Sequence, residues 1–284
     1  MKHNILIPTD FSKNSLKALS YARELHKNDT CDFYILNVFS ATSNILDSLL
    51  NLEPGSKLYE QAKYNSEEGL ARVYDMITFS NDENPKHHFE VISRFNNVID
   101  AIKQIVEQKD IEMIVMGTKG QTHSKATAFG STAIYVMEKV RNCPVIVVPE
   151  NSKIELPNEI VFPTSFKTHY KRRELNYLTS IAKKSDATIA ILHVKEDDAL
   201  NQTQIDNKQL LEDILEGTNY KFHNMSHHSV MVAVNLFVES RSSDMVAFIN
   251  KKHAFFGSVL TNALVKNISF HLNVPILTMH DLRN

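Results

Sequence analysis

The sequence predicts an α/β protein built from two similar domains, each an open parallel sheet of about five strands flanked by helices. Short apolar runs that are typical of buried strands alternate with segments of helical periodicity. This alternation is the pattern of parallel sheets that helices cover on both faces. A short polar tether at Glu150–Lys153 separates two such series. We therefore expect a first domain at 1–150 and a second at 151–284, packed closely together.

An internal repeat supports the division into two units. Residues 4–38 are similar to residues 159–194. Three correspondences carry this similarity, namely Pro8-Thr9 with Pro163-Thr164, Phe11 with Phe166, and Leu36-Asn37-Val38 with Leu192-His193-Val194. The ends of the two units also match, as Asn142-Cys143-Pro144-Val145-Ile146 and Asn273-Val274-Pro275-Ile276.

The elements of the first domain can be assigned in order. Ser12 is expected to cap a helix, because Leu16, Leu19, Ala22 and Leu25 recur after it at helical spacing. Residues 40–65 interrupt the alternation with Ser, Asn and a Pro54-Gly55 pair, so we expect a loop that carries a short helix. Met113 and Phe248 are expected in the core. Strands are predicted at 5–7, 33–39, 89–93, 111–116 and 145–148, and a further helix at 98–106.

Composition excludes several classes of function. The 284 residues are 43% hydrophobic and 23% charged, as in soluble globular proteins, and the net charge of -2 comes without a basic patch for nucleic acid. No signal-peptide core or membrane span is apparent, so we expect a cytoplasmic protein without a membrane partner. Cys31 and Cys143 have neither disulfide nor metal-ligand spacing, which favours a reducing compartment.

Glycine is concentrated in one stretch. The chain has only 7 glycines, yet Gly117, Gly120 and Gly130 follow one predicted strand and precede a helical pattern. We expect positive φ at Gly117 and Gly120, with the backbone close to a ligand. The amides of the following helix, with the hydroxyls of Ser131 and Thr132, would then face an anion such as phosphate. Neither the Walker loop nor the dinucleotide-binding Gly-x-Gly-x-x-Gly motif occurs.

The spacing Gly-x-x-Gly, nine residues, Gly-Ser resembles the ATP-binding signature of the universal stress protein family. The resemblance extends to the opening Ile7–Asp10, the strand end Leu36–Val38 and the close Cys143–Pro149. The two units together resemble the tandem, two-domain form of this family. The resemblance implies two Rossmann-like domains of the adenine nucleotide alpha hydrolase-like type, and ATP, with or without Mg²⁺, as the ligand.

The resemblance also implies a set of binding residues. Asp10 would accept a hydrogen bond from the ribose, Val38 would form an apolar wall, and the glycine-rich segment would hold the phosphates. For Lys119, His123 and Lys125 in the same loop, screening of phosphate charge and simple solvation are both open. The predicted cofactor-binding residues are Pro8, Thr9, Asp10, Val38, Met116, Gly117, Gly120, Gly130, Ser131 and Thr132.

The second unit departs from this motif. Asp10 is replaced by Ser165, Gly117 by Ile249 and Gly120 by Lys252, and Gly130-Ser131 by Thr261-Asn262. We therefore expect ATP binding by the first domain alone. The second domain is expected to pair with the first through the last strand of each unit, as a pseudo-dimer within the chain. A homodimer of the whole chain is an additional prediction.

Three classes of function remain open at this point. The first is a regulatory protein that binds ATP and turns it over slowly or not at all. The second is an ATPase or another nucleotide-dependent enzyme of related fold, although no His-x-Gly-His or Ser-Gly-Gly-x-Asp-Ser element occurs. The third is metal binding through His223, His227 and His228, which is disfavoured because neighbouring strand residues point to opposite faces. We assign no catalytic residue and no metal ligand.

Overall fold

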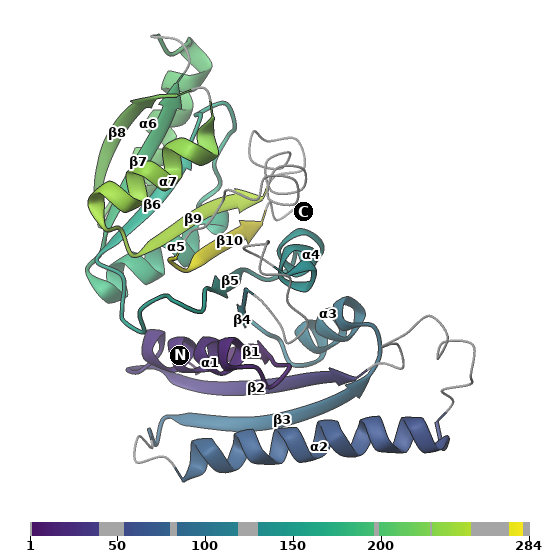
Figure 1. Cartoon of the computed structure of the whole chain (residues 1–284). Coiled ribbons are helices and arrows are strands. Elements are labelled where there is room, and N and C mark those ends of the chain that lie inside the picture. The colour runs from purple at the N-terminus through teal and green to yellow at the C-terminus, as the bar shows by residue number, and fades with distance from the viewer. Residues whose placement is uncertain are drawn as a thin grey trace.

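The described residues form one ten-stranded sheet with helices on both faces (Figure 1). The computed structural model describes residues 2–39, 54–79, 84–118, 130–195, 199–227, 229–250 and 273–280. We call residues 1–150 the first half and 151–284 the second half. None of the helices in the described ranges is long and apolar enough to cross a membrane.

Strands and helices alternate along both halves. The first half contains β1 (Lys2–Pro8), α1 (Lys13–Leu25), β2 (Thr30–Phe39), α2 (Lys57–Thr78), β3 (His87–Phe95), α3 (Val98–Gln108), β4 (Met113–Gly117), α4 (Ser131–Lys139) and β5 (Val145–Val148). The second half contains β6 (Glu159–Thr164), α5 (Arg172–Ser185), β7 (Thr188–Lys195), α6 (Gln202–Leu215), β8 (Asn219–Ser226), α7 (Val230–Arg241), β9 (Met245–Asn250) and β10 (Ile276–His280).

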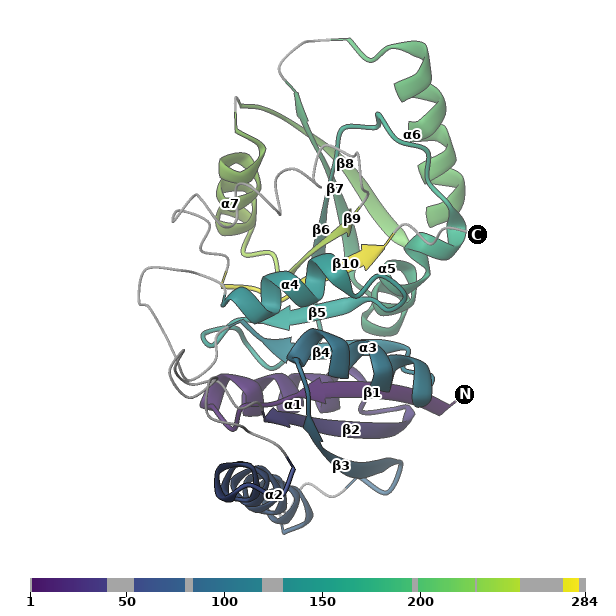
Figure 2. The same ribbon diagram turned by 90° about the vertical axis from the view of Figure 1, so that its right-hand side faces the viewer.

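The strand order is β3-β2-β1-β4-β5-β10-β9-β6-β7-β8. Read outward from the centre, each half has the same order, and its neighbouring strands are parallel. The two halves meet where β5 pairs antiparallel with β10, with Leu277 opposite Ile146. Figure 2 shows β5 and β10 side by side, with their arrows in opposite directions. We call this strand pair the seam.

Two apolar layers hold the helices against the sheet. One layer contains Ala18 of α1, Leu70 of α2, Leu175 of α5 and Leu211 of α6. The other contains Ile102 of α3, Val136 of α4 and Val234 of α7. Each layer draws residues from both halves, so the core is continuous across the seam.

Apart from residues 40–65, the predicted strands and helices of the first half are confirmed. Ser12 is the N-cap of α1, and its side chain accepts a hydrogen bond from the backbone N–H of Ser15. Met113 and Phe248 are buried, as expected. Gly55 has φ +95°, in agreement with a turn at Pro54-Gly55.

The expectation for residues 40–65 is wrong in one respect. No short helix lies within the described part, 54–65, because Lys57 already begins the 22-residue helix α2. The apolar stripe of α2, at Leu70, Val73 and Ile77, lies in its second part, where it packs on the sheet. The first part of α2 is mainly exposed and polar, so its sequence lacks the apolar residues at helical spacing that predict a helix. Residues 40–53 lie outside the described ranges.

Candidate functional site

The strand order of the first half creates a switch point between β1 and β4. From β1, the chain continues to β2 on one side of the sheet, whereas β4 and β5 lie on the other side. Ligands of open parallel sheets bind at the carboxyl ends of the strands beside such a point. Pro8 ends β1 and Gly117 ends β4, so the predicted residues of these two strands are brought together there.

Several hydrogen bonds fix the turn that follows β1, most of them through Thr9. The backbone N–H of Thr9 donates to the carbonyl of Leu36 at 2.8 Å, and the side-chain amide of Asn37 donates to the carbonyl of Thr9 at 2.7 Å. The hydroxyl of Thr9 hydrogen-bonds that of Ser15 at 2.9 Å and accepts the N–H of Phe11 at 3.0 Å. Phe11 has φ 64°, which reverses the chain into α1. Asp10, between Thr9 and Phe11, is therefore held in a defined position.

Asp10 is not the N-cap of α1, because Ser12 has that role. The Asp10 carboxylate is half-buried, and its Oδ1 accepts the backbone N–H of Ser12 at 3.2 Å. This local hydrogen bond stiffens the turn. The carboxylate therefore has a structural role in the turn, although it is not the helix cap.

Gly117 serves a purpose that differs from the one expected. Its φ is not positive, because it continues the extended backbone of β4. A Cβ at this position would lie 2.7 Å from Oδ1 of Asn14 and 3.1 Å from the backbone carbonyl carbon of Asn14. Gly117 is thus required for the close approach of α1 to β4. The prediction of positive φ at Gly117 is wrong, and Gly120 lies outside the described residues.

Asn14 is a buried residue of this site that the sequence analysis does not identify. It is 3% exposed, and its amide donates to the carbonyl of Val148 at 2.9 Å. Its Oδ1 accepts the hydroxyl of Thr118 at 3.1 Å. A signal was present, because Asn14 precedes Ala18 by four residues and so lies on the apolar face of α1.

The helix after the glycine-rich segment begins without a side-chain cap. Gly130 is the N-cap of α4, in extended conformation with φ -69° and ψ 152°, and its N–H donates to the carbonyl of Thr118 at 2.6 Å. Ser131 and Thr132 form the exposed first turn. A first turn whose amides have no side-chain cap within the described part of the chain presents N–H groups and a positive dipole end. Lys119, His123 and Lys125 lie in the undescribed range 119–129.

Val38 and Met116 complete the described part of the predicted set. Val38 is half-buried near the carboxyl end of β2 and packs against the apolar layer that contains α3 and α4. Met116 is 6% exposed and belongs to the same layer. Both residues therefore contribute apolar surface on the face of the sheet where α4 begins.

The second half repeats the framework of this site with different side chains. The hydroxyl of Thr164 accepts the N–H of Phe166 at 3.0 Å, and Phe166 has φ 56°. Ser165 occupies the place of Asp10, and its carbonyl accepts the side-chain amide of Gln204 at 2.8 Å. The strand pairs Ile5–Met113 and Ile160–Met245 place Ile249 at the position of Gly117. Lys252, Thr261 and Asn262 lie in the undescribed range 251–272.

A cavity of about 390 Å³ lies elsewhere in the molecule. Its lining includes Tyr21, Lys153, Asp244 and Pro275, and none of the predicted binding residues.

The histidines of the second half do not form a metal cluster within the described ranges. The ring of His223 stacks edge-on against Phe237, and His227 hydrogen-bonds the backbone of Ser229. His228 is outside the described residues.

Comparison with known proteins adds the family context. The sequence model of the universal stress protein family matches residues 1–149. A curated universal stress protein of Methanocaldococcus jannaschii is 29% identical over 149 residues, which are 52% of this chain and 83% of that protein.

Solved structures share the fold over almost the whole chain. A universal stress protein from Archaeoglobus fulgidus has a TM-score of 0.71 at 21% identity, with 97% of both chains covered. The cytoplasmic domain of a prokaryotic cation chloride cotransporter has a TM-score of 0.53 at 10% identity, with 99% of this chain and 96% of that one covered. These two likenesses concern the fold.

Proposed function

The chain belongs to the universal stress protein family, and on this premise we propose that it is a regulatory protein that binds ATP at the switch point of its first half. The observation that carries the proposal is the uncapped start of α4 beside the ends of β1 and β4. Its amides suit phosphate, as backbone N–H groups at helix N-termini generally do. Asp10, held in its turn, would accept the ribose hydroxyls, and Val38 would contact the adenine.

We also propose that only the first half holds ATP. Ser165 in place of Asp10 supports this asymmetry. Without the Asp10 carboxylate, a ribose hydroxyl would lose its charged acceptor. In this proposal the domains are 1–150 and 151–284, and the second domain serves to pair with the first through β5 and β10. Association of two chains into a homodimer is part of the same proposal.

The ATP in this site would be held and not rapidly consumed. We assign the carboxylate of Asp10 to the ribose, so that Mg²⁺ would be bound through the phosphates and water. We place the protein in the cytoplasm, where the two free, buried cysteines, Cys31 and Cys143, would remain reduced.

Calorimetric titration of the full chain with ATP tests the proposal. We expect one ATP per chain, and about a tenfold to hundredfold loss of affinity in Asp10→Ala, because a hydrogen bond to a charged group is lost. Ser165→Ala is the matched control, since it alters the equivalent turn of the second half and should leave the affinity unchanged. Two ATP molecules per chain, or equal effects of the two variants, would contradict the proposal.

A phosphate-release assay on the same preparation separates regulation from enzymatic turnover. We expect a rate far below about 1 s⁻¹, the lower end of ordinary enzyme turnover. A rate above this value would identify the chain as an ATPase.

A further inference from the structure

A second cluster of chemically reactive groups lies at the turn that joins α1 to β2. Ligand atoms of His26, Asp29 and Cys31 all lie within 4.8 Å of one another. His26 is the C-cap of α1, and Cys31 is the second residue of β2. This turn is at the amino ends of β1 and β2, the edge of the sheet opposite to the proposed nucleotide site. The two sites are therefore independent.

We propose that His26, Asp29 and Cys31 bind a divalent transition-metal ion of the zinc class. An imidazole nitrogen, a carboxylate oxygen and a thiolate sulfur are the three donor types that Zn²⁺ takes in proteins. Sites with three protein ligands keep a fourth position for water. The partly exposed carboxylate of Asp29 is the side from which ion and water would enter.

The imidazole ring of His26 is buried. His26 is 5% exposed, and its Nε2 has no hydrogen-bond partner among the described residues. Its Nδ1 lies 2.9 Å from Oδ2 of Asp29. Nδ1 is therefore the nitrogen placed to bind an ion beside Asp29, and Nε2 would then carry the ring proton.

The thiol of Cys31 is fully buried and forms no disulfide. Without a metal ion, burial raises the pKa of this thiol to about 12, so it stays protonated. On metal binding the thiol proton leaves to solvent, and the sulfur bonds the ion as thiolate. The charge of the ion replaces that of the proton, so no oxidant or reductant is needed.

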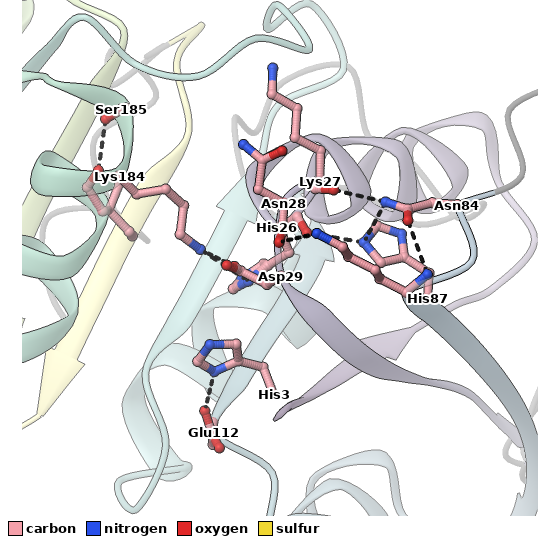
Figure 3. A network of polar contacts seen from close by, with 12 residues as sticks. His3, His26, Lys27, Asn28, Asp29, Asn84, His87, Glu112, Lys184 and Ser185 are labelled. Carbon is pink, nitrogen blue, oxygen red and sulfur yellow. Dashed lines mark hydrogen bonds and ion pairs between the residues drawn. The ribbon is translucent and has the colours of Figure 1, made fainter. Parts of the chain in front are cut away.

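The position of the ion is now taken by a charge from the other half of the molecule. The ammonium group of Lys184, near the end of α5, contacts Oδ2 of Asp29 and lies 3.3 Å from Nδ1 of His26 (Figure 3). Its side chain is 22% exposed, so it can turn outward into solvent. Metal and Lys184 would therefore exclude each other, and metal binding would release a contact between the two halves.

A neighbouring pair borders the cluster. His3 pairs with Cys31 across β1 and β2, and its ring centroid lies 5.5 Å from that of His26. Its Nδ1 is 2.7 Å from Oε2 of Glu112 (Figure 3). The negative charge of Glu112 would therefore offset a positive charge on the His3 ring, which would then repel a bound cation less strongly.

Titration of the full chain with Co²⁺ under reducing conditions tests the proposal, because a cobalt–thiolate bond produces a charge-transfer band in the near ultraviolet. The chain has only 2 cysteines, so Cys143→Ser leaves Cys31 as the single thiol and should retain the band. Cys31→Ser should lose it, and Zn²⁺ should displace cobalt and abolish it. Absence of the band in the wild-type chain and in Cys143→Ser would overturn the proposal, even if Cys31→Ser does not fold.

Lys184→Met tests the competition with the ammonium group. Removal of a like charge from a charged site commonly changes its affinity for a cation by about tenfold or more, so we expect Co²⁺ to bind at least that much more tightly. Lys183→Met, one residue away in α5, is the matched control and should bind as the wild type does. Equal affinities in the two variants would overturn the role of Lys184.

Discussion

At the scale of single residues, Gly117 shows how one position can be identified for the wrong reason. Its place at the end of a strand, beside other glycines, predicted a special role, and the structure places it at the switch point. The reason is a contact with Asn14 across 103 positions of the chain, and not an unusual φ. Sequence patterns report local conformation, whereas a close approach between distant residues depends on tertiary packing.

Gly117→Ala should therefore destabilise the protein directly. A Cβ 2.7 Å from Oδ1 of Asn14 forces α1 away from β4, and overpacking of this kind costs about 1–3 kcal/mol. The free energy of unfolding in urea is the measurement. Ser131→Ala, an exposed position at the start of α4, is the control and should cost much less.

A double-mutant cycle with Asn14→Ala checks the cause. With the shorter side chain at position 14, part of the clash disappears, so the two substitutions together should cost less than the sum of their separate effects. Strict additivity would mean that Asn14 is not the group that Gly117 accommodates. A loss of ATP affinity in Gly117→Ala alone is consequently no test of phosphate binding.

At the scale of elements, the strands of the first half and helices α1 and α3 could be predicted because each carries its own period. Ser12 and the apolar residues after it specify α1 without help from the rest of the chain. α2 could not be predicted in full. Its first turns are mostly exposed. They are held by the cap at Ser56, by the contact of the Tyr59 ring with the rings of Phe39 and Phe95, and by continuity with the packed part of the helix.

Ser56→Ala should reveal how far α2 depends on its cap. The Ser56 hydroxyl accepts the backbone N–H of Tyr59 at 3.2 Å, and loss of such a cap costs about 1 kcal/mol. Ser56→Asp preserves an acceptor and should be close to neutral. Hydrogen exchange in the first turns of α2 measures the effect, and equal protection in both variants would contradict it.

At the scale of the whole molecule, the seam makes the two halves one body. Leu277 of β10 and Ile146 of β5 face each other, and both are fully buried. A strand order common to the two halves was predictable, because repeats imply similar topology. The cluster that contains His26, Asp29, Cys31 and Lys184 could not be predicted. The spacing of Cys31 does not indicate a metal site, and no local sequence pattern shows that Lys184 of α5 contacts the end of α1.

Leu277→Ala should weaken both halves together. Truncation of a fully buried leucine costs about 2–5 kcal/mol, and here the cavity would lie between strands of both halves. Hydrogen exchange should accelerate in β4 and in β9 alike. Leu236→Ala, at a site that is 45% exposed, is the control and should leave both strands protected. Acceleration confined to β9 would mean that the halves unfold independently.

The antiparallel joint between β5 and β10 has a genetic consequence. When two identical subunits meet across such a joint, every substitution appears twice, once on each side. Here one gene encodes the two sides as separate segments, so a substitution can alter one half alone. Ser165, at the position that corresponds to Asp10, is an example. The two halves can therefore differ at the turns that follow β1 and β6 while the pairing of β5 with β10 is kept.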